Sequence, residues 1–523
     1  MPPGLVLGVA LASALVMALT GARALGAPRP NILFIMSDDH AAHAISSYGS
    51  RVNQTPHLDR LGAAGLRLDR CFAVNSICTP SRATILTGQY SHRNGQPVFN
   101  HLDPARITVA HRMREAGYHT VMIGKWHLGS DPQGFDQWNI LPGQGRYVDP
   151  ILYDRTGHRV YRGYVTDVLT DLTLDALRRR PKDRPFFIMA HHKAPHREWT
   201  PNDRYRREFA TRVIPEPRTL RDTYQGRSDA LREQRQSVSR DLTRRDLKLV
   251  PPSELAGPER ERWLSTTPTE VSVVQEGQTN LLTGEALAAW KYQRYMQDYL
   301  GCVQSVDDSV GRLLDWLDAE GLRENTLVIY TSDQGFFLGD LGMYDKRFMY
   351  DPSIRMPFLA RWPAGIRPGT TSSALAINVD FAPTFLELAG AEIPADMQGR
   401  SLTPLFQGGR PEGWRDAFYY RYYHDPGHHN TRAHYGIRTE THKLIHYWKS
   451  GQWELYDLAQ DPDEQTNLYG RADTQILADQ LKSRLLRLKS ELGDTDQFAQ
   501  ALPVDDVDQP PPQLKLKHPD SPL

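Results

Sequence analysis

A cysteine stands at the start of a short helical pattern, directly before a Thr-Pro-Ser-Arg sequence. It is Cys78, and the stretch 75–88 reads NSICTPSRATILTG. A threonine or serine can cap this helix, proline is allowed in its first turn, and Gly88 is suited to its end. Position 78 is therefore predicted at a helix N-terminus, where backbone N–H groups favour a tetrahedral oxyanion. Arg82, one turn further on, can return to the same point as a bidentate anion donor.

A lone cysteine is most often a packing residue of a protein core. The Pro-Ser-Arg sequence that follows Cys78, and the cations Lys125 and Lys346 on other predicted loops, favour a functional role instead. The chain has only three cysteines, too few for a disulfide framework. One bridge between Cys71 and Cys302 and a set of buried free thiols are both compatible with this number.

Three carboxylates and one amide follow two apolar runs, 30–39 and 325–335, that are far apart in the chain. These four residues are Asp38, Asp39, Asp333 and Gln334. If they meet, the carboxylates repel one another unless a cation lies between them. A ligand set made only of oxygen atoms favours Ca²⁺ or Mg²⁺ over zinc. The alternative is that both pairs are turn residues that end strands.

Two further apolar runs, 119–129 and 184–196, end in basic residues. These residues are Lys125, His127, His192, Lys193 and His196. Apolar runs without polar alternation suit strands buried on both faces, as in a parallel sheet, and helical patterns lie between them. The chain therefore predicts an α/β fold in which a mostly parallel sheet lies between helices. Ligands bind such sheets at the carboxyl ends of the strands, where all four polar clusters are expected, so one shared site is predicted.

The chain divides into regions of different composition. An apolar stretch followed by small residues predicts a signal peptide over 1–27, with an uncleaved N-terminal anchor as the alternative. A catalytic domain is expected over 28–399. Within it, the arginine-rich segment 199–282 is interpreted as an insertion over the active face or a solvated surface excursion. Short aromatic strands and a closing helix predict an α+β subdomain with an antiparallel sheet over 400–495, and the tail 496–523 is expected to be disordered or loosely wrapped.

The charge balance limits the classes of partner. Lys and Arg together number 62, as do Asp and Glu, so the net charge is zero. No basic excess indicates nucleic acid, and any recognition of anions must be local. The apolar leader predicts export to the periplasm or the medium, or to a lysosome in a eukaryote. No stable membrane insertion is expected after the leader is cleaved.

The block CTPSRATILTGQYSHRNG resembles the signature of the type I sulfatases, the formylglycine-dependent enzymes of the alkaline phosphatase superfamily. Further blocks occur in the family's order: NILFIMSDDH, GKWHLG, HKAPHREW, TSDQGFFLGDLGMYDKRFMYDPSIRMPFLARWP and DLAQDPDEQTNL. Together they cover nearly the whole chain after the leader. The resemblance implies an alkaline phosphatase-like sheet with a smaller C-terminal subdomain, and the activity of a sulfuric ester hydrolase.

The resemblance also implies that Cys78 is converted to formylglycine by a formylglycine-generating maturation enzyme. One hydroxyl of the hydrated aldehyde then attacks sulfur, and deprotonation of the second hydroxyl releases sulfate. The implied metal ligands, with Ca²⁺ the usual ion and Mg²⁺ the alternative, are Asp38, Asp39, Cys78, Asp333 and Gln334. Many relatives have asparagine at the position of Gln334, so the amide oxygen is shifted here by one methylene.

The remaining catalytic residues that the resemblance implies are basic. Arg82 and Lys125 match the residues that hold and activate the hydrated aldehyde, and His127 matches the proton acceptor. His196 matches the histidine near the leaving oxygen, and Lys346 the lysine on the sulfate. Two further residues are predicted to contact substrate, with packing behind the site as their alternative: His192 and Lys193.

The block HKAPHREW looks most like N-acetylglucosamine-6-sulfatases and related enzymes acting on glycosaminoglycans, mucin or algal polysaccharides. We therefore expect a sulfated carbohydrate as substrate. Two alternatives remain at this stage. One is a phosphate or phosphonate ester hydrolase of the same superfamily, since the number of cations does not distinguish sulfur from phosphorus. The other is a non-catalytic glycan-binding relative, which is expected to lack Cys78, Arg82 or a metal carboxylate.

Overall fold

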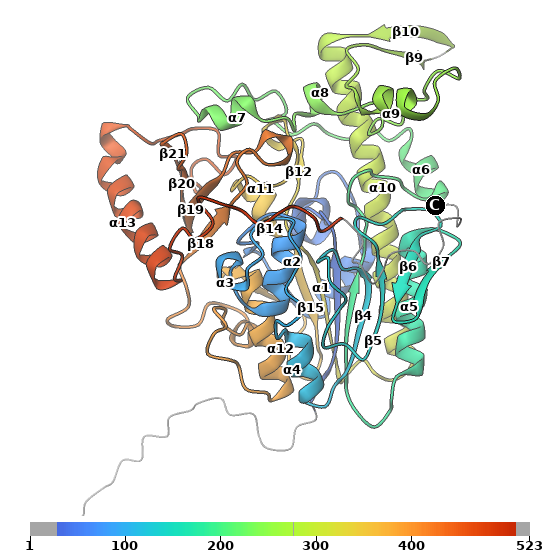
Figure 1. Cartoon of the computed structure of the whole chain (residues 1–523), viewed down its shortest axis with the longest axis vertical. Coiled ribbons are helices and arrows are strands. Elements are labelled where there is room, and N and C mark those ends of the chain that lie inside the picture. The colour runs from blue at the N-terminus through green and yellow to red at the C-terminus, as the bar shows by residue number, and fades with distance from the viewer. Residues whose placement is uncertain (1–28, 276, 509–523) are drawn as a thin grey trace, which may run out of the picture.

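The computed structural model describes residues 29–275 and 277–508 of the 523-residue chain. The predicted signal peptide, 1–27, lies outside these residues. Within them, no helix combines the length and the apolar composition that crossing a membrane requires. Figure 1 shows a large α/β body with a smaller, separate sheet on one side of it.

The α/β body is built on one mixed sheet of ten strands. In spatial order these are β16 (Thr370–Ser372), β2 (Leu66–Leu68), β15 (Phe358–Arg361), β11 (Thr326–Ser332), β1 (Asn31–Ser37), β8 (Phe186–His191), β4 (His119–Lys125), β5 (Gln137–Leu141), β6 (Ile151–Asp154) and β7 (Gly157–Val160). The four apolar runs of the sequence form the adjacent strands β11, β1, β8 and β4, all parallel. Antiparallel strands extend the sheet at both ends, and the predicted fold class is confirmed.

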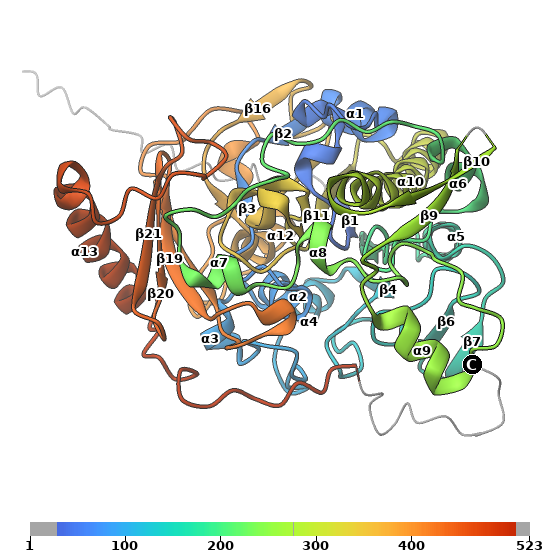
Figure 2. The same ribbon diagram turned by 90° about the horizontal axis from the view of Figure 1, so that it is seen from above.

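Helices cover both faces of the sheet, which explains why its central strands lack polar alternation. Along β1, Leu33 and Ile35 pack into one core, whereas Ile32 and Phe34 pack into the other. The first core is covered by α1 (Pro56–Ala63), α5 (Val165–Arg179) and α10 (Gly284–Ala319), the second by α2 (Cys78–Thr87), α4 (Val109–Glu115) and α12 (Phe381–Ala389). Figure 2 shows α1 and α10 on the opposite side of β1 from α2 and α4.

All three cysteines are buried free thiols. Cys71 packs into the core that contains α2, whereas Cys302 packs into the core on the other face of the sheet. The bridge that the sequence left open between these two residues is therefore not formed.

The segment between β8 and α10 contains α6 (Asp203–Phe209), α7 (Asp229–Glu233), α8 (Val238–Asp241), α9 (Gly257–Ser265), β9 (Val271–Gln275) and β10 (Gln278–Leu282). Its parts differ in burial. Tyr205, Phe209 and Leu242 belong to the core beside α10, whereas the β9–β10 hairpin exposes Val274 and Leu281 and projects from the body in Figure 1. The segment is thus anchored by apolar residues and is more than a solvated excursion.

The smaller sheet is antiparallel and consists of β18 (Ala417–Tyr422), β19 (His434–Thr439), β20 (His442–Tyr447) and β21 (Gln452–Asp457), with α13 (Gln475–Glu491) alongside. It shares a third apolar core with residues that flank the helix carrying Cys78, including Phe72, Val74 and Ile77. The C-terminal subdomain is therefore packed directly against the segment that leads into α2.

Gly124 is the residue of β4 at which no larger side chain fits. Its φ is +99°, and a Cβ there would lie 1.9 Å from the backbone oxygen of His191 on β8. We expect Gly124→Ala to destabilise the protein by about 3 kcal/mol or more, because left-handed strain adds to a clash between two backbones. Thermal unfolding measures the effect.

Gly321→Ala is the matched control, since Gly321 also has a positive φ, +68°, but nothing lies within 4 Å of its Cβ position. It should cost only about 1 kcal/mol. Equal losses in the two variants would contradict the close approach of β4 and β8.

Candidate functional site

Three carboxylates meet at the carboxyl ends of β1 and β11. These strands pair in parallel with Ser37 opposite Ser332, so the residues that follow them, Asp38 and Asp333, are neighbours. Oxygen atoms of Asp38, Asp39 and Asp333 lie within 4.8 Å of one another, and all three side chains are fully buried. Their proximity follows from strand register alone.

Burial is the main cause that raises the pKa of Asp39 to about 7 and that of Asp333 to about 6, and neighbouring carboxylates raise both further. Burial also opposes ionisation of Asp38, but Lys125, His196 and Arg82 outweigh it and hold its pKa well below the usual range. Carboxylates crowded in this way favour a bound cation.

Gln334 supports a cation at the same point. Its Nε2 donates to Asp39 Oδ1 at 2.5 Å, while its Oε1 is buried and has no hydrogen-bond partner among the residues that the structure describes. A buried carbonyl oxygen without a donor is costly unless a cation or water satisfies it. The donor set consists of oxygen atoms from four residues, which fits Ca²⁺ or Mg²⁺.

Each carboxylate also faces a cation from another element. Arg82 on α2 donates to Asp333 Oδ2 from Nε at 3.0 Å and from Nη2 at 2.9 Å. Lys346 Nζ lies 2.6 and 2.7 Å from the two oxygens of Asp39, and Lys125 pairs with Asp38. Three positive charges therefore balance three negative ones inside the site.

Cys78 opens α2 and faces this cluster. Its Sγ lies 3.5 Å from Asp38 Oδ1. The Sγ, an oxygen of Asp38 and a ring nitrogen of His196 lie within 4.8 Å of one another, so the three could together ligate a metal ion. Burial is the main cause that raises the pKa of the thiol far above its usual range, and Asp38 raises it further. Burial beside a carboxylate therefore disfavours the thiolate, the nucleophilic form of Cys78.

The predicted histidines occupy different places. His196 Nε2 lies 3.8 Å from Asp39 Oδ2, and burial lowers the pKa of His196 well below its usual value. His127 lies at the end of β4, with its Nδ1 3.3 Å from Thr79 Oγ1. Both rings therefore adjoin the groups around Cys78.

His192 was predicted either to contact substrate or to pack behind the site. It is buried, and its Nε2 lies 3.1 Å from Ser309 Oγ on α10, so it packs on the helix that covers the sheet. Burial alone lowers its pKa to about 4, without a contribution from the charged cluster. His192 directly follows the end of β8 and packs on α10, which favours the packing alternative, whereas Lys193 lines a cavity beside the site.

Lys193 and His196 line a cavity of about 670 Å³ beside the cluster. Its other walls include Gln144, Tyr147 and Asp246. Lys193 Nζ lies 4.8 Å from the centre of the Tyr147 ring, and burial, with help from Lys125, lowers its pKa to about 8. Asp246 belongs to the segment between β8 and α10, so that segment forms part of the wall.

Two residues of the site were missed by sequence reasoning. Gln144 accepts a hydrogen bond from Lys125 Nζ at 2.6 Å, and Asp508 lies 3.0 Å from His127 Nε2. Neither residue ends a buried apolar run, so the pattern that identified the other candidates does not reach them.

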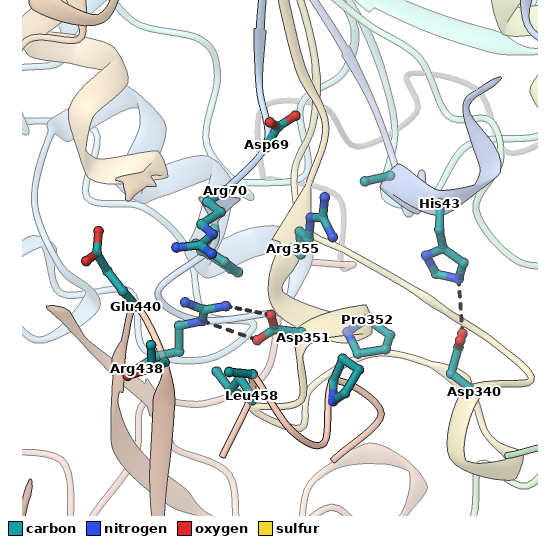
Figure 3. Close-up of a pocket in the computed structure, with 15 residues that line it drawn as sticks. His43, Asp69, Arg70, Asp340, Asp351, Pro352, Arg355, Arg438, Glu440 and Leu458 are labelled. Carbon is teal, nitrogen blue, oxygen red and sulfur yellow. Dashed lines mark hydrogen bonds and ion pairs between the residues drawn. The ribbon is translucent and has the colours of Figure 1, made fainter. Parts of the chain in front are cut away.

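A second cavity, of about 450 Å³, lies between the α/β body and the C-terminal sheet. Figure 3 shows that its charged side chains include two ion pairs, Arg438 with Asp351 and His43 with Asp340. None of the predicted site residues lines it. We therefore place the candidate active site at the carboxylate cluster and the 670 Å³ cavity beside it, which His196 and Lys193 line.

Two family models match the chain. The model described as "Sulfatase" matches residues 30–391, and the model described as "N-sulphoglucosamine sulphohydrolase, C-terminal" matches residues 339–491. Among curated proteins, an N-acetylglucosamine-6-O-sulfatase of Bacteroides thetaiotaomicron is 45% identical over 491 residues, covering 90% of this chain and 88% of its own. The human N-acetylglucosamine-6-sulfatase is 26% identical over 534 residues, covering 90% and 86%.

Solved structures of similar fold also include enzymes that act on esters. A protein in complex with its substrate D-glucosamine-2-N,6-O-disulfate superposes with a TM-score of 0.84 at 43% identity, over 91% of this chain and 100% of the other. A phosphonate monoester hydrolase of Agrobacterium radiobacter superposes with a TM-score of 0.65 at 23% identity, over 89% and 96%. The second likeness shows a shared fold alone.

The pairing of Arg82 with the carboxylates can be tested without substrate. Removing this cation leaves Asp333 buried without its ion-pair partner, which costs about 3–5 kcal/mol. We expect Arg82→Met to lower the thermal midpoint strongly in the presence of a chelator. Arg60→Met is the control, because Arg60 pairs with Asp315 at the exposed surface and such a pair is worth about 1 kcal/mol or less. Similar midpoints for the two variants would contradict the buried cluster.

Proposed function

The chain belongs to the sulfatase family and is a sulfuric ester hydrolase, and from this premise we propose that it removes the 6-O-sulfate of glucosamine units in a glycan. The observation that carries the proposal is the position of Cys78 against Asp38, within a buried group of three carboxylates and three cations. The names of two relatives that are more than 40% identical support sulfated glucosamine as the substrate.

The residues present fit a divalent cation. Asp38, Asp39, Asp333 and Gln334 would hold Ca²⁺, with Mg²⁺ as the alternative, because they offer crowded buried oxygens and one amide oxygen that no group in the described part of the chain hydrogen-bonds. When bound, the ion adds positive charge for a sulfate group and makes a nearby hydroxyl more acidic.

The proposal includes conversion of Cys78 to formylglycine by a maturation enzyme. Its support is the position of Cys78 at the start of α2, with its Sγ 3.5 Å from Asp38 Oδ1, and burial there disfavours the thiolate that would act as a nucleophile. The hydrated aldehyde supplies a hydroxyl nucleophile and a second hydroxyl through which sulfate can be released. Arg82 and Lys125 lie beside residue 78 and orient anionic groups there.

The other side chains have roles that follow from their places. Lys346 and Lys193 supply positive charge to the sulfate oxygens, from the cluster and from the cavity wall. His196 lies where the cavity meets the cluster. The negative charge of a bound sulfate ester would raise the pKa of this ring, so it is the group that we assign to donate a proton to the leaving sugar oxygen. His127, on the opposite side near Thr79, is assigned to accept a proton.

Export is part of the proposal, to the periplasm, the medium or a lysosome. One support is the apolar leader of the sequence. The other is that glycans with sulfate on glucosamine are extracellular polymers or their fragments, so an enzyme that acts on them must leave the cytoplasm. The arginine-rich segment beside the cavity offers further positive charge for a polyanionic chain.

A panel of sulfated sugars tests the substrate. We expect the wild-type enzyme to desulfate 6-O-sulfated N-acetylglucosamine and N-sulfoglucosamine, with the loss of sulfate read by mass spectrometry. The variant Cys78→Ala should lose more than about 10³-fold in kcat, because no nucleophile remains at residue 78. Mass spectrometry of the peptide that contains residue 78 reports whether the cysteine has been converted.

Rates of hydrolysis of matched aryl sulfate, phosphate and phosphonate esters distinguish a sulfatase from a phosphate or phosphonate ester hydrolase. A strong preference for a phosphorus ester would overturn the sulfatase proposal in favour of the superfamily's other hydrolases. Glycan binding without turnover, by protein in which residue 78 is converted, would identify a non-catalytic relative.

Metal binding has a readout that does not depend on activity. At a Ca²⁺ concentration a hundredfold above Kd, the ion should stabilise the folded protein by about 2.7 kcal/mol, seen as a rise in the thermal midpoint. Asp333→Asn should abolish that rise, whereas the surface variant Asp315→Asn should retain it. A rise of equal size in both variants would place the ion elsewhere.

A further inference from the structure

We propose that Asp508 is a positioning residue for His127, delivered to the active site by the C-terminal segment; this inference rests on the proposed function. In it, the Asp508 carboxylate holds a proton on Nε2 of His127. The other ring nitrogen, Nδ1, is then free to accept a proton on the side of residue 78.

The segment that carries Asp508 is attached along its length. It runs from the end of α13 back to the α/β body, and Figure 2 shows it crossing between the two parts. The backbone N–H groups of Asp506 and Val507 donate to the oxygen of Phe99 at 3.0 and 2.9 Å, and Phe99 N donates to Asp505 Oδ1 at 3.1 Å. Val507 is buried as well. Asp508 is therefore placed by fixed neighbours.

Three aspartates of this segment each meet a histidine. Asp505 pairs with His424, Asp506 with His101, and Asp508 with His127. Only the last of these histidines belongs to the predicted catalytic set. The segment thus provides one such pair at the active site and two neighbouring pairs outside it.

The surroundings of His127 do not otherwise favour a proton on Nε2. Lys125 Nζ donates to Gln144 Oε1, which fixes the amide so that its Nε2 lies 3.2 Å from His127 Nε2. This contact favours an unprotonated Nε2 on His127, which accepts a hydrogen bond from the Gln144 amide. Thr79 Oγ1 lies near Nδ1 and donates to the His127 backbone oxygen at 2.9 Å, so its lone pairs favour a proton on Nδ1.

Asp508 opposes both of these contacts. Its Oδ1 lies 3.0 Å from His127 Nε2, nearer than the Gln144 amide, and a carboxylate is a stronger hydrogen-bond partner than an amide. Burial is the main cause that lowers the pKa of His127 to about 4, so the neutral ring is favoured. A neutral ring carries one proton, either on Nδ1 or on Nε2. The carboxylate selects Nε2, as the aspartate of a catalytic triad does for its histidine.

The same contacts serve the ring after it accepts a proton. The proton arrives at Nδ1 from the reacting hydroxyl group and later passes to solvent. While it is present, Thr79 Oγ1 can accept from Nδ1–H and Asp508 from Nε2–H, so both donors of the charged ring have partners. Without Asp508, the positive ring would face buried Lys125 with no compensating charge at Nε2.

Steady-state kinetics on the converted enzyme tests the role. We expect Asp508→Ala to lower kcat by about 10- to 100-fold while KM changes less than about twofold, and Asp508→Glu to restore much of the loss. Asp506→Ala is the matched control: it removes the neighbouring aspartate side chain but leaves the backbone bonds to Phe99, so kcat should stay within about twofold. Thermal midpoints confirm that each variant is folded.

Nitrogen-15 NMR of the histidine rings makes the test independent of turnover, so a failure of the proposed function can be distinguished from a failure of this inference. The expected result is a proton on Nε2 of His127 in the wild type and on Nδ1 in Asp508→Ala. An unchanged kcat in Asp508→Ala, an effect on KM alone, an equal loss in Asp506→Ala, or a wild-type ring protonated on Nδ1 would each overturn it.

Discussion

Three carboxylates are buried within a few ångströms of one another, and the rest of the site depends on how their mutual repulsion is balanced. Asp38, Asp39 and Asp333 each face a cation that comes from a different part of the chain. A buried carboxylate without such a partner is unstable as an anion, so these ion pairs hold α2, β4 and the loop of Lys346 to the same point. A divalent ion added there would leave an excess of positive charge for an anionic ester.

Strand pairing turns this balance into defined geometry. Parallel β1 and β11 place the residues that follow them side by side, and the close approach of β4 to β8 at Gly124 brings Lys125 into the same region. The N-terminus of α2 directs Cys78 at Asp38 because the segment before the helix is packed against the C-terminal sheet. The two parts of the molecule therefore form the site together.

Elements outside the main sheet contribute residues to the cavity wall and to the surroundings of His127. The segment between β8 and α10 provides Asp246 to the wall of the 670 Å³ cavity. The chain then returns after α13 and places a carboxylate on the far side of His127. The wall of the cavity and the surroundings of His127 thus depend on parts of the chain that are remote from the central strands.

The sequence by itself determined the four buried strands, the polar residues at their ends and the resemblance to sulfatases, because these features are local in the chain. Apolar runs reveal strands, and residues that end such runs in a parallel sheet must share one edge. It did not decide the direction of His192, which follows the end of β8 where no strand periodicity applies, and only its contact with Ser309 on α10 shows that the ring packs on that helix. Gln144 and Asp508 were found only in the tertiary structure, because loop and tail residues carry no periodic signal and reach the site through contacts between distant segments.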